Sequence, residues 1–326
     1  MDARIRSSLS RRDVLRAGLL ASVGAGGARF AAAAAASHAS ASRAPSAAGE
    51  PLITKPIPST GERLPVIGLG TDSFREDERA HIRDVIARMH RLGGTVIDTS
   101  SDYGASEALI GDALADSGLR SSTFLATKLT DGRGFFGGIG GAASFERSLK
   151  RLRTRKVDLL QVHNLQGVDA LMPLLRKWKR EGRIRYYGIT TSRPFQHRDL
   201  VRYMQRYALD FIQVDYSIAD RDAERQIFPL AVARKIAVLV NLPLVHGQLM
   251  RRAAASKLPA WAGEIGVGSW AQFLLKYVVS NPAVTCAIPG TTKVAHLVDD
   301  QGAGRGTLPD AAARKRMEEY WSEVVS

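Results

Sequence analysis

The sequence predicts an α/β protein: a (β/α)8 TIM barrel with an N-terminal β-hairpin and an additional C-terminal helix. Two observations lead to this prediction. From residue 53 onward, eight short runs rich in β-branched residues alternate with eight amphipathic stretches of helical period, and such even alternation favours a barrel over a doubly wound sheet. Residues 51–326 also have the length of a single barrel domain, which commonly runs to about 250 residues.

The expected elements follow one another along the chain. A hairpin comes first, with strands at 53–57 and 62–64 flanking the turn residues 59–61, and it could plug the bottom of the barrel. Buried parallel strands are predicted at 66–68, 95–98, 124–127, 157–163, 184–189, 211–215, 237–241 and 284–288. Helices are predicted at 78–92, 107–116, 142–152, 169–181, 197–205, 223–234, 269–280 and 294–300. The tail, 310–325, has the pattern of one more amphipathic helix outside the barrel.

Residues 1–50 have the pattern of an export signal and an Ala/Ser-rich segment. Arg11 and Arg12 precede a short apolar run at 17–25, and small residues follow it. A positive region, a hydrophobic region and a small-residue cleavage zone are the three parts of a signal peptide. The pattern resembles a twin-arginine signal, cleaved after Ala36 or Ala41; a disordered basic tail on a cytoplasmic protein is the alternative. We therefore expect the twin-arginine export machinery as a partner and a periplasmic or exported protein. The apolar run is too short for a stable membrane span.

Composition and charge favour an ordinary globular protein over a nucleic-acid-binding one. The chain is 45% hydrophobic and 24% charged, with a formal net charge of +14. Its positive residues are spread along the sequence, and the densest run, 176–185, lies at the end of a predicted helix, where cations suit the helix dipole. Cys286 is the only cysteine; it lies in an apolar run and is expected in the core. No cluster of His, Cys, Asp and Glu has the spacing of a metal site.

Four titratable residues are predicted to meet at one rim of the barrel. Asp98 ends the second predicted strand and Tyr103 lies in the loop after it, while Lys128 follows the third strand and His163 ends the fourth. In barrels of this kind the chemistry is located where strands end and loops begin. We therefore expect these four side chains to form a catalytic group.

The chemistry of these residue types supports that expectation. A free tyrosine has a pKa near 10, and a lysine ammonium beside it lowers that pKa towards the working range. A buried lysine needs a carboxylate partner, which Asp98 would provide. His163 could then hydrogen-bond a carbonyl oxygen while Tyr103 protonates it.

Four stretches together resemble the aldo-keto reductase superfamily. They are D-T-S-S-D-Y-G-A-S-E at 98–107, T-K at 127–128, V-H-N at 162–164 and I-P-G-T-T at 288–292, and the resemblance runs from about residue 53 to 301. It implies NAD(P)H-dependent reduction of aldehydes or ketones to alcohols by hydride transfer, with Tyr103 as general acid. The catalytic tetrad of the superfamily maps onto Asp98, Tyr103, Lys128 and His163 without substitution.

The resemblance also implies an NADP(H) cofactor, with NAD(H) as the alternative. Tyr216 matches the aromatic residue that stacks on the nicotinamide, and Thr190 and Gln213 match the positions that hold its carboxamide. The pyrophosphate contacts implied are Ser217, Leu244, Gly247 and Leu249. The adenosine phosphate end is implied to meet Pro289, Gly290, Thr291, Thr292, Lys293, His296 and Asp300. Lys293 is the cation expected to face a 2′-phosphate.

Loops at the same face are expected to line the site for a small carbonyl substrate. The residues expected there are Phe74, Arg133, Phe135 and His246. Two other functions stay open on the sequence alone. The first is a non-catalytic NADP-binding sensor or accessory barrel; the second is a barrel isomerase or hydrolase without a redox cofactor.

Overall fold

The computed structural model describes residues 50–132 and 140–324. The predicted export signal and the expected substrate-lining residues Arg133 and Phe135 therefore lie outside the described residues. Within the described ranges, no helix is long and apolar enough to cross a membrane. The same ranges hold no cluster of His, Cys, Asp and Glu that could bind a metal ion.

Eight parallel strands form the central sheet, hydrogen-bonded to one another in their order along the chain. They are β3 (Leu69–Gly70), β4 (Val96–Asp98), β5 (Phe124–Leu129), β6 (Val157–Val162), β7 (Ile184–Thr190), β8 (Phe211–Asp215), β9 (Ala237–Asn241) and β10 (Cys286–Ala287). The first and last strands meet through parallel bridges between Ile67 and Ala287 and between Gly70 and Gly290. The sheet therefore closes on itself, and the predicted (β/α)8 barrel is confirmed.

At this closing seam the last strand is shorter than the predicted 284–288, and the first begins only after the predicted run 66–68, since the pairing there is reduced to isolated bridges. Gly68 N donates to Ala287 O at 2.8 Å, and Gly70 N donates to Pro289 O at 2.9 Å. A Cβ atom on Gly70 would lie 2.7 Å from Ile288 O, closer than a side chain tolerates. The absence of a side chain at this glycine is what allows the seam to close.

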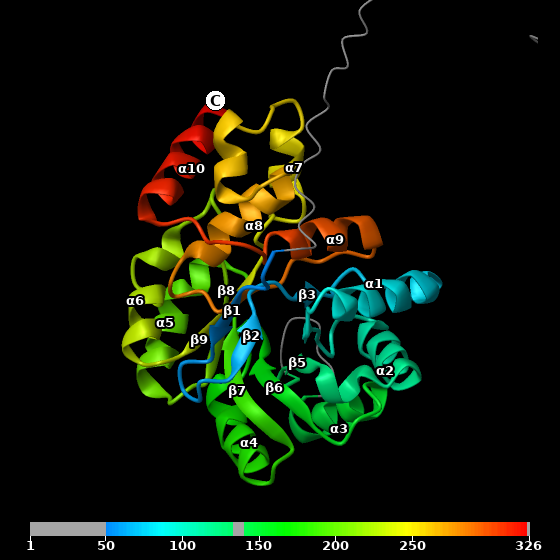
Figure 1. Cartoon of the computed structure of the whole chain (residues 1–326). Helices are drawn as coiled ribbons and strands as arrows, with labels where there is room; N and C mark the ends of the chain where they lie inside the picture. Colours follow the sequence, from blue (N-terminus) through cyan, green and yellow to red (C-terminus); the bar gives the residue numbers. More distant parts are fainter. Residues whose placement is uncertain (1–49, 133–139, 325–326) are drawn as a thin grey trace, which may run out of the picture. The chain divides into compact units, whose positions relative to one another are not determined.

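Helices surround the strands (Figure 1). They are α1 (Arg79–Arg91), α2 (Ser106–Ser117), α3 (Gly141–Arg151), α4 (Val168–Arg180), α5 (His197–Arg206), α6 (Ile227–Ala233), α7 (Gln248–Ala253), α8 (Trp270–Ser280), α9 (Val294–Gly302) and α10 (Ala311–Val324). In α1 the residues Ile82, Val85, Ile86 and Met89 are buried, the spacing of one apolar helical face. The short α7 was not predicted, because six residues give too little periodicity to detect.

The predicted hairpin is present and enters the barrel. β1 (Thr54–Pro56) pairs antiparallel with β2 (Arg63–Pro65). Ile57 and Leu64, which flank the turn, are buried in one cluster with Val96, Phe124 and Phe211 from the barrel strands. The hairpin therefore contributes to the hydrophobic interior of the barrel, as a plug would.

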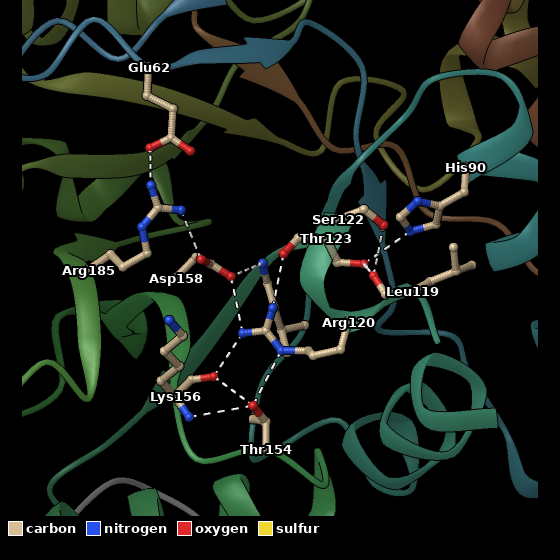
Figure 2. A network of polar contacts seen from close by, with 11 residues as sticks. Glu62, His90, Leu119, Arg120, Ser122, Thr123, Thr154, Lys156, Asp158 and Arg185 are labelled. Atoms are coloured by element: carbon tan, nitrogen blue, oxygen red, sulfur yellow. Dashed lines mark hydrogen bonds and ion pairs between the residues drawn. The ribbon is translucent and has the colours of Figure 1, made fainter. Parts of the chain in front are cut away.

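A polar network fastens the hairpin to the N-terminal ends of the strands (Figure 2). Arg185 pairs with Glu62 of the hairpin and, at 3.0 Å, with Asp158 of β6. Asp158 also lies 3.2 Å from Arg120. Because the active sites of such barrels are located at the opposite face, we assign this network to stability.

Lys55 makes a second connection between the hairpin and the barrel. Its Nζ donates to the carbonyl oxygens of Val279, Asn281 and Val284, each at 2.7 Å. We expect Lys55→Met to lower the free energy of unfolding by about 2 kcal/mol, since acceptors would lose their donor in a largely buried place. Urea unfolding measures this effect. The control is Lys177→Met, whose side chain is 59% exposed and which should change stability by less than about 0.5 kcal/mol. Equal effects in both variants would contradict the assignment.

Candidate active site

The four residues predicted to be catalytic lie together at the C-terminal ends of the strands. Asp98 is the last residue of β4, and His163 directly follows β6. Lys128 lies inside β5, which extends to Leu129, rather than after the strand as predicted. The Lys128 Nζ atom is 5.0 Å from the centre of the Tyr103 ring, and the Tyr103 and His163 rings are 5.7 Å apart, edge to face.

Lys128 and Asp98 form a buried ion pair. The distance from Nζ to Asp98 Oδ2 is 2.5 Å, and the two side chains are 1% and 3% exposed. Nζ also donates to Thr99 O at 2.8 Å. Burial alone would lower the pKa of Lys128, but the Asp98 carboxylate and the Tyr103 phenol outweigh it, and the pKa is raised. Lys128 is therefore an ammonium group at neutral pH.

Two buried glutamines hold the other oxygen of Asp98. Gln213 Nε2 donates to Asp98 Oδ1 at 3.0 Å, and Gln161 Nε2 lies 3.4 Å from the same oxygen. The sequence predicted Gln213 as a carboxamide contact, and the structure gives it this second task of orienting Asp98. Gln161 was missed, although a glutamine within the apolar run of β6 was a detectable signal. Its Oε1 has no hydrogen-bond partner among the described residues.

Tyr103 is half-buried, and its pKa differs from the sequence-based expectation. Burial raises the pKa of the phenol more than Lys128 lowers it, so the net direction is upward. The expectation considered the lysine alone and omitted the desolvation of the phenolate. Tyr103 is consequently protonated at neutral pH, the state that a proton donor requires.

His163 has two polar neighbours that the sequence analysis did not single out. Its Nδ1 lies 3.2 Å from Asp102 Oδ2 and 3.1 Å from Ser100 Oγ. Burial lowers the pKa of His163, while the hydrogen bond that the ring donates to Asp102 opposes that change. The neutral imidazole is therefore favoured at neutral pH. Both neighbours belong to the loop that also carries Tyr103.

The ring of Tyr216, which is predicted to stack on the nicotinamide, packs among other aromatic side chains. Tyr216 is 1% exposed, and its ring packs edge to face on Phe228 and stacks on Tyr277. Its hydroxyl contacts Glu224 and accepts from Arg314 at 2.8 Å. These partners belong to the helical layer outside the barrel, and the stacking role of Tyr216 stays a prediction.

Several residues predicted to meet the nicotinamide and the pyrophosphate are buried. Thr190 is 1% exposed and Leu249 is 2% exposed. Ser217 is also buried, and its hydroxyl accepts from Asp220 N at 3.1 Å in a tight turn. The structure thus gives Ser217 a turn-forming role, and its expected pyrophosphate contact stays a prediction. The contacts expected of Thr190 and Leu249 remain predictions.

The loop between β9 and α7 has an unusual backbone. Leu242, Val245 and His246 have φ angles of 51°, 48° and 50°, a left-handed region that costs energy for residues other than glycine. Gly247 follows with φ 74°, where a glycine is favoured. Leu244 is partly buried against the core. Strained backbone concentrates at functional loops, which agrees with the cofactor and substrate contacts predicted here.

Asn241, the last residue of β9, was not predicted to belong to the site. Its Nδ2 donates to Thr191 O at 2.9 Å. Its Oδ1 is buried and has no hydrogen-bond partner among the described residues. An unsatisfied acceptor at a strand end is suited to a ligand that brings a donor, such as the amide of a nicotinamide. A polar residue ending a strand is the signal that could have identified it.

The adenosine end predicted from the sequence forms one continuous stretch. Thr291 Oγ1 accepts from Lys293 N at 3.1 Å, and Thr292 Oγ1 donates to Glu78 Oε1 at 3.1 Å. The side chain of Lys293 is exposed at the N-terminus of α9, where backbone N–H groups favour an anion. Pro289 is buried, while Gly290 and His296 are exposed. This stretch therefore fits a phosphate group.

Asp300 of α9 is a buried acid in the same predicted set. It is 5% exposed, and burial, together with repulsion from Asp299, raises its pKa to about 8. An unfolded aspartate has a pKa of about 3.9. The folded form therefore holds the proton more tightly, and the stability that this proton contributes is complete below about pH 4 and lost as pH rises through about 8.

We expect Asp300→Asn to gain stability relative to wild type as pH rises, because the amide never ionises. The difference in Tm should increase between about pH 4 and about pH 9, measured by calorimetry without nucleotide. Asp299→Asn is not a suitable control, since Asp299 Oδ1 accepts hydrogen bonds from Ser269 and Gln272. Asp199→Asn, whose side chain is 55% exposed, serves instead. A difference that does not change with pH would contradict the prediction.

Of the residues expected to line the substrate site, two lie within the described ranges. The ring of Phe74 is 4% exposed and belongs to the main hydrophobic core, and its expected contact with the substrate stays a prediction. An apolar residue in a loop between β3 and α1 can face either way, and here it packs inward. His246 is exposed and remains a candidate.

Known proteins share this sequence pattern and fold. A sequence model of the Aldo/keto reductase family matches residues 66–316. "Methylglyoxal reductase YeaE" of Escherichia coli is 29% identical over 245 residues, which are 72% of this chain and 83% of the relative. "Uncharacterized oxidoreductase YqkF" of Bacillus subtilis is 27% identical over 286 residues, covering 78% of this chain and 89% of the relative.

Solved structures share the fold of this chain. An aldo-keto reductase from Bacillus halodurans in its holo form aligns with a TM-score of 0.67 at 25% identity, covering 82% of this chain and 96% of that one. An aldo/keto reductase from Klebsiella pneumoniae, solved with NADP and acetate, aligns with a TM-score of 0.67 at 24% identity, covering 80% and 93%. The match over most of the barrel shows that this chain belongs to the Aldo/keto reductase family.

Proposed function

We propose that this protein is an NADPH-dependent reductase of small aldehydes or ketones. The observation that carries the proposal is the assembly of Tyr103, His163 and the buried Lys128–Asp98 pair at one rim of the barrel. Membership of the Aldo/keto reductase family supports the reaction class. The name of the Escherichia coli relative, a methylglyoxal reductase, supports a small α-dicarbonyl as one substrate to test.

The residues around the rim fit a dinucleotide. Lys293 and the N-terminus of α9 would hold phosphate groups, with NAD(H) as the alternative cofactor if Lys293 does not contact a 2′-phosphate. Asn241 Oδ1 would accept from the nicotinamide carboxamide. A bound reduced nicotinamide supplies the hydride for the carbonyl carbon.

The protein's own side chains would handle the proton. Tyr103, kept protonated by burial, would donate to the carbonyl oxygen as charge develops there. Lys128 would stabilise the phenolate that remains, and Asp98 would keep Lys128 charged and aimed. His163, when Nε2 carries a proton, would hold the carbonyl oxygen in place by a hydrogen bond. Together these side chains would carry out general acid catalysis.

A substrate panel tests the proposal. Methylglyoxal and a set of simple aldehydes and ketones would be incubated with NADPH or NADH, and oxidation of the nucleotide would be followed by absorbance. We expect turnover of at least one small carbonyl with NADPH preferred, and Lys293→Met should raise the KM for NADPH more than that for NADH. Tight NADPH binding without turnover of any carbonyl would favour the sensor function instead.

We also propose that the protein is exported by the twin-arginine route, on the strength of Arg11, Arg12 and the apolar run after them. Replacing both arginines with lysine should move the protein from the periplasmic to the cytoplasmic fraction.

Because a periplasm is not expected to regenerate free NADPH, we propose that the exported protein retains its nucleotide. Nucleotide lost on dialysis of the periplasmic protein would contradict retention.

A further inference from the structure

The loop that carries Tyr103 also brings a carboxylate to His163. Asp102 Oδ2 lies 3.2 Å from His163 Nδ1. Asp102 is itself oriented from its own loop: Ser101 Oγ donates to its Oδ1 at 3.1 Å, and its backbone N–H donates to Ser100 Oγ at 3.3 Å. The Asp102 side chain is 51% exposed, whereas that of His163 is 12% exposed. A solvated carboxylate thus contacts a nearly buried imidazole.

The partners at Nδ1 decide which ring nitrogen carries the proton. An ionised carboxylate only accepts hydrogen bonds, so a bond to Asp102 requires a proton on Nδ1. The hydrogen bond to His163 lowers the pKa of Asp102, which keeps that carboxylate ionised. Ser100 Oγ, 3.1 Å from the same nitrogen, can accept as well as donate and does not oppose this arrangement.

A neutral imidazole has one proton for two nitrogens. If that proton is on Nδ1, then Nε2 offers a lone pair and cannot donate to a carbonyl oxygen. Only the doubly protonated ring can donate from Nε2 while Nδ1 stays bonded to Asp102. The pairing therefore makes hydrogen-bond donation by His163 dependent on pH.

We propose that Asp102 is a positioning residue that fixes the proton of His163 on Nδ1, so that His163 Nε2 donates to the substrate carbonyl only when the ring is protonated. The inference rests on the proposed carbonyl reduction for its functional consequence. The tautomer itself does not depend on that function.

Other charged groups near His163 also affect whether its imidazole ring is protonated. Lys128 disfavours the imidazolium, whereas Asp98 and Asp102 favour it. Tyr103 contacts the ring edge to face and is neutral at the relevant pH. Of these groups, Lys128 and Asp98 neutralise one another as a pair. Asp102 is the carboxylate that acts on Nδ1 directly.

The tautomer can be measured without any catalytic assay. Protein labelled with 15N-histidine reports the protonation of each ring nitrogen by NMR, and comparison with His163→Asn identifies the His163 signals. We expect wild type to show the Nδ1-protonated form above its pKa. Asp102→Asn should move the ring towards the Nε2-protonated form and lower the pKa of His163. The control is Asp199→Asn, which removes one negative charge from a distant α5 side chain that is 55% exposed. It should change neither the tautomer nor the pKa of His163.

The pH profile of kcat/KM for carbonyl reduction gives the second measurement. In wild type, kcat/KM should fall as pH rises through the pKa of His163, by about 10-fold or more. In Asp102→Asn this fall should shrink to about 3-fold or less, because the neutral ring can now donate from Nε2. Asp199→Asn should keep the wild-type profile.

The outcomes separate this inference from the proposed function. An Nε2-protonated ring in wild type, or a tautomer unchanged in Asp102→Asn, would overturn the inference even if the protein reduces carbonyls. The expected tautomer shift in a protein that reduces no carbonyl would uphold the pairing and refute the proposed function. An active protein with the expected tautomers but identical pH profiles would refute the functional consequence.

Discussion

Tyr103→Phe is expected to lower kcat/KM for carbonyl reduction by about 10²–10⁴-fold, the usual contribution of a positioned proton donor. The phenol is the group that burial keeps protonated beside Lys128. Phenylalanine retains the ring that packs edge to face against His163, so the fold and nucleotide binding should change little. Steady-state kinetics and nucleotide titration by fluorescence measure both quantities.

Tyr207→Phe is the matched control. That hydroxyl is bonded to Asp169 of α4, and its loss should leave kcat/KM within about 2-fold of wild type. Full activity in Tyr103→Phe would mean that another group supplies the proton, and the assigned mechanism would be wrong.

Lys128→Met is expected to lower the free energy of unfolding by about 3–5 kcal/mol, the largest change among the proposed variants. It should also abolish activity. The substitution leaves the Asp98 carboxylate buried at 3% exposure without its cation, and an uncompensated buried charge is strongly destabilising. Gln161 and Gln213 would still donate to Asp98, but neutral donors do not replace the ammonium. Urea unfolding measures the change.

The double variant Asp98→Asn, Lys128→Met separates stability from catalysis. With both charges removed, most of the lost stability should return, because a buried ion pair and a neutral pair of similar shape are often equally stable. Activity should not return, since no cation remains beside Tyr103. A double variant as unstable as Lys128→Met would show that the cost arises from packing rather than from charge.

The barrel could be predicted because its signals are local and repeated. Strand and helix periods alternate eight times, and the rule that chemistry follows the strand ends placed Asp98 and His163 at one rim. The seam was less predictable. Gly70 and the carbonyl of Ile288 come close only because the barrel closes, and closure is a long-range event that a run such as 66–68 does not encode.

Side-chain direction explains where the candidate site departs from the sequence-based expectations. Tyr216 follows a strand end, as a cofactor contact would, but its hydroxyl is bound by Arg314 from the distant α10. Phe74 is in a rim loop and yet packs into the core. The pairing of Asp102 with His163 joins residues from two strand-end loops. Each of these outcomes depends on a partner far away in the sequence.

The raised pKa of Tyr103 also depends on the folded structure rather than on the local sequence. Sequence analysis identified the lysine that favours the phenolate, but only the folded structure shows how much water the phenol loses. Desolvation and charge act in opposite directions on such a group, and their balance depends on packing that no motif records.

Transfer of deuterium from NADPH labelled at C4 of the nicotinamide tests the central claim most directly. Each stereoisomer of the labelled nucleotide would be incubated with the enzyme and a carbonyl substrate, and the alcohol would be analysed by mass spectrometry. We predict one deuterium on the carbinol carbon from one stereoisomer only, with the rate reduced in Tyr103→Phe. Alcohol without deuterium from either stereoisomer would contradict hydride transfer at this rim.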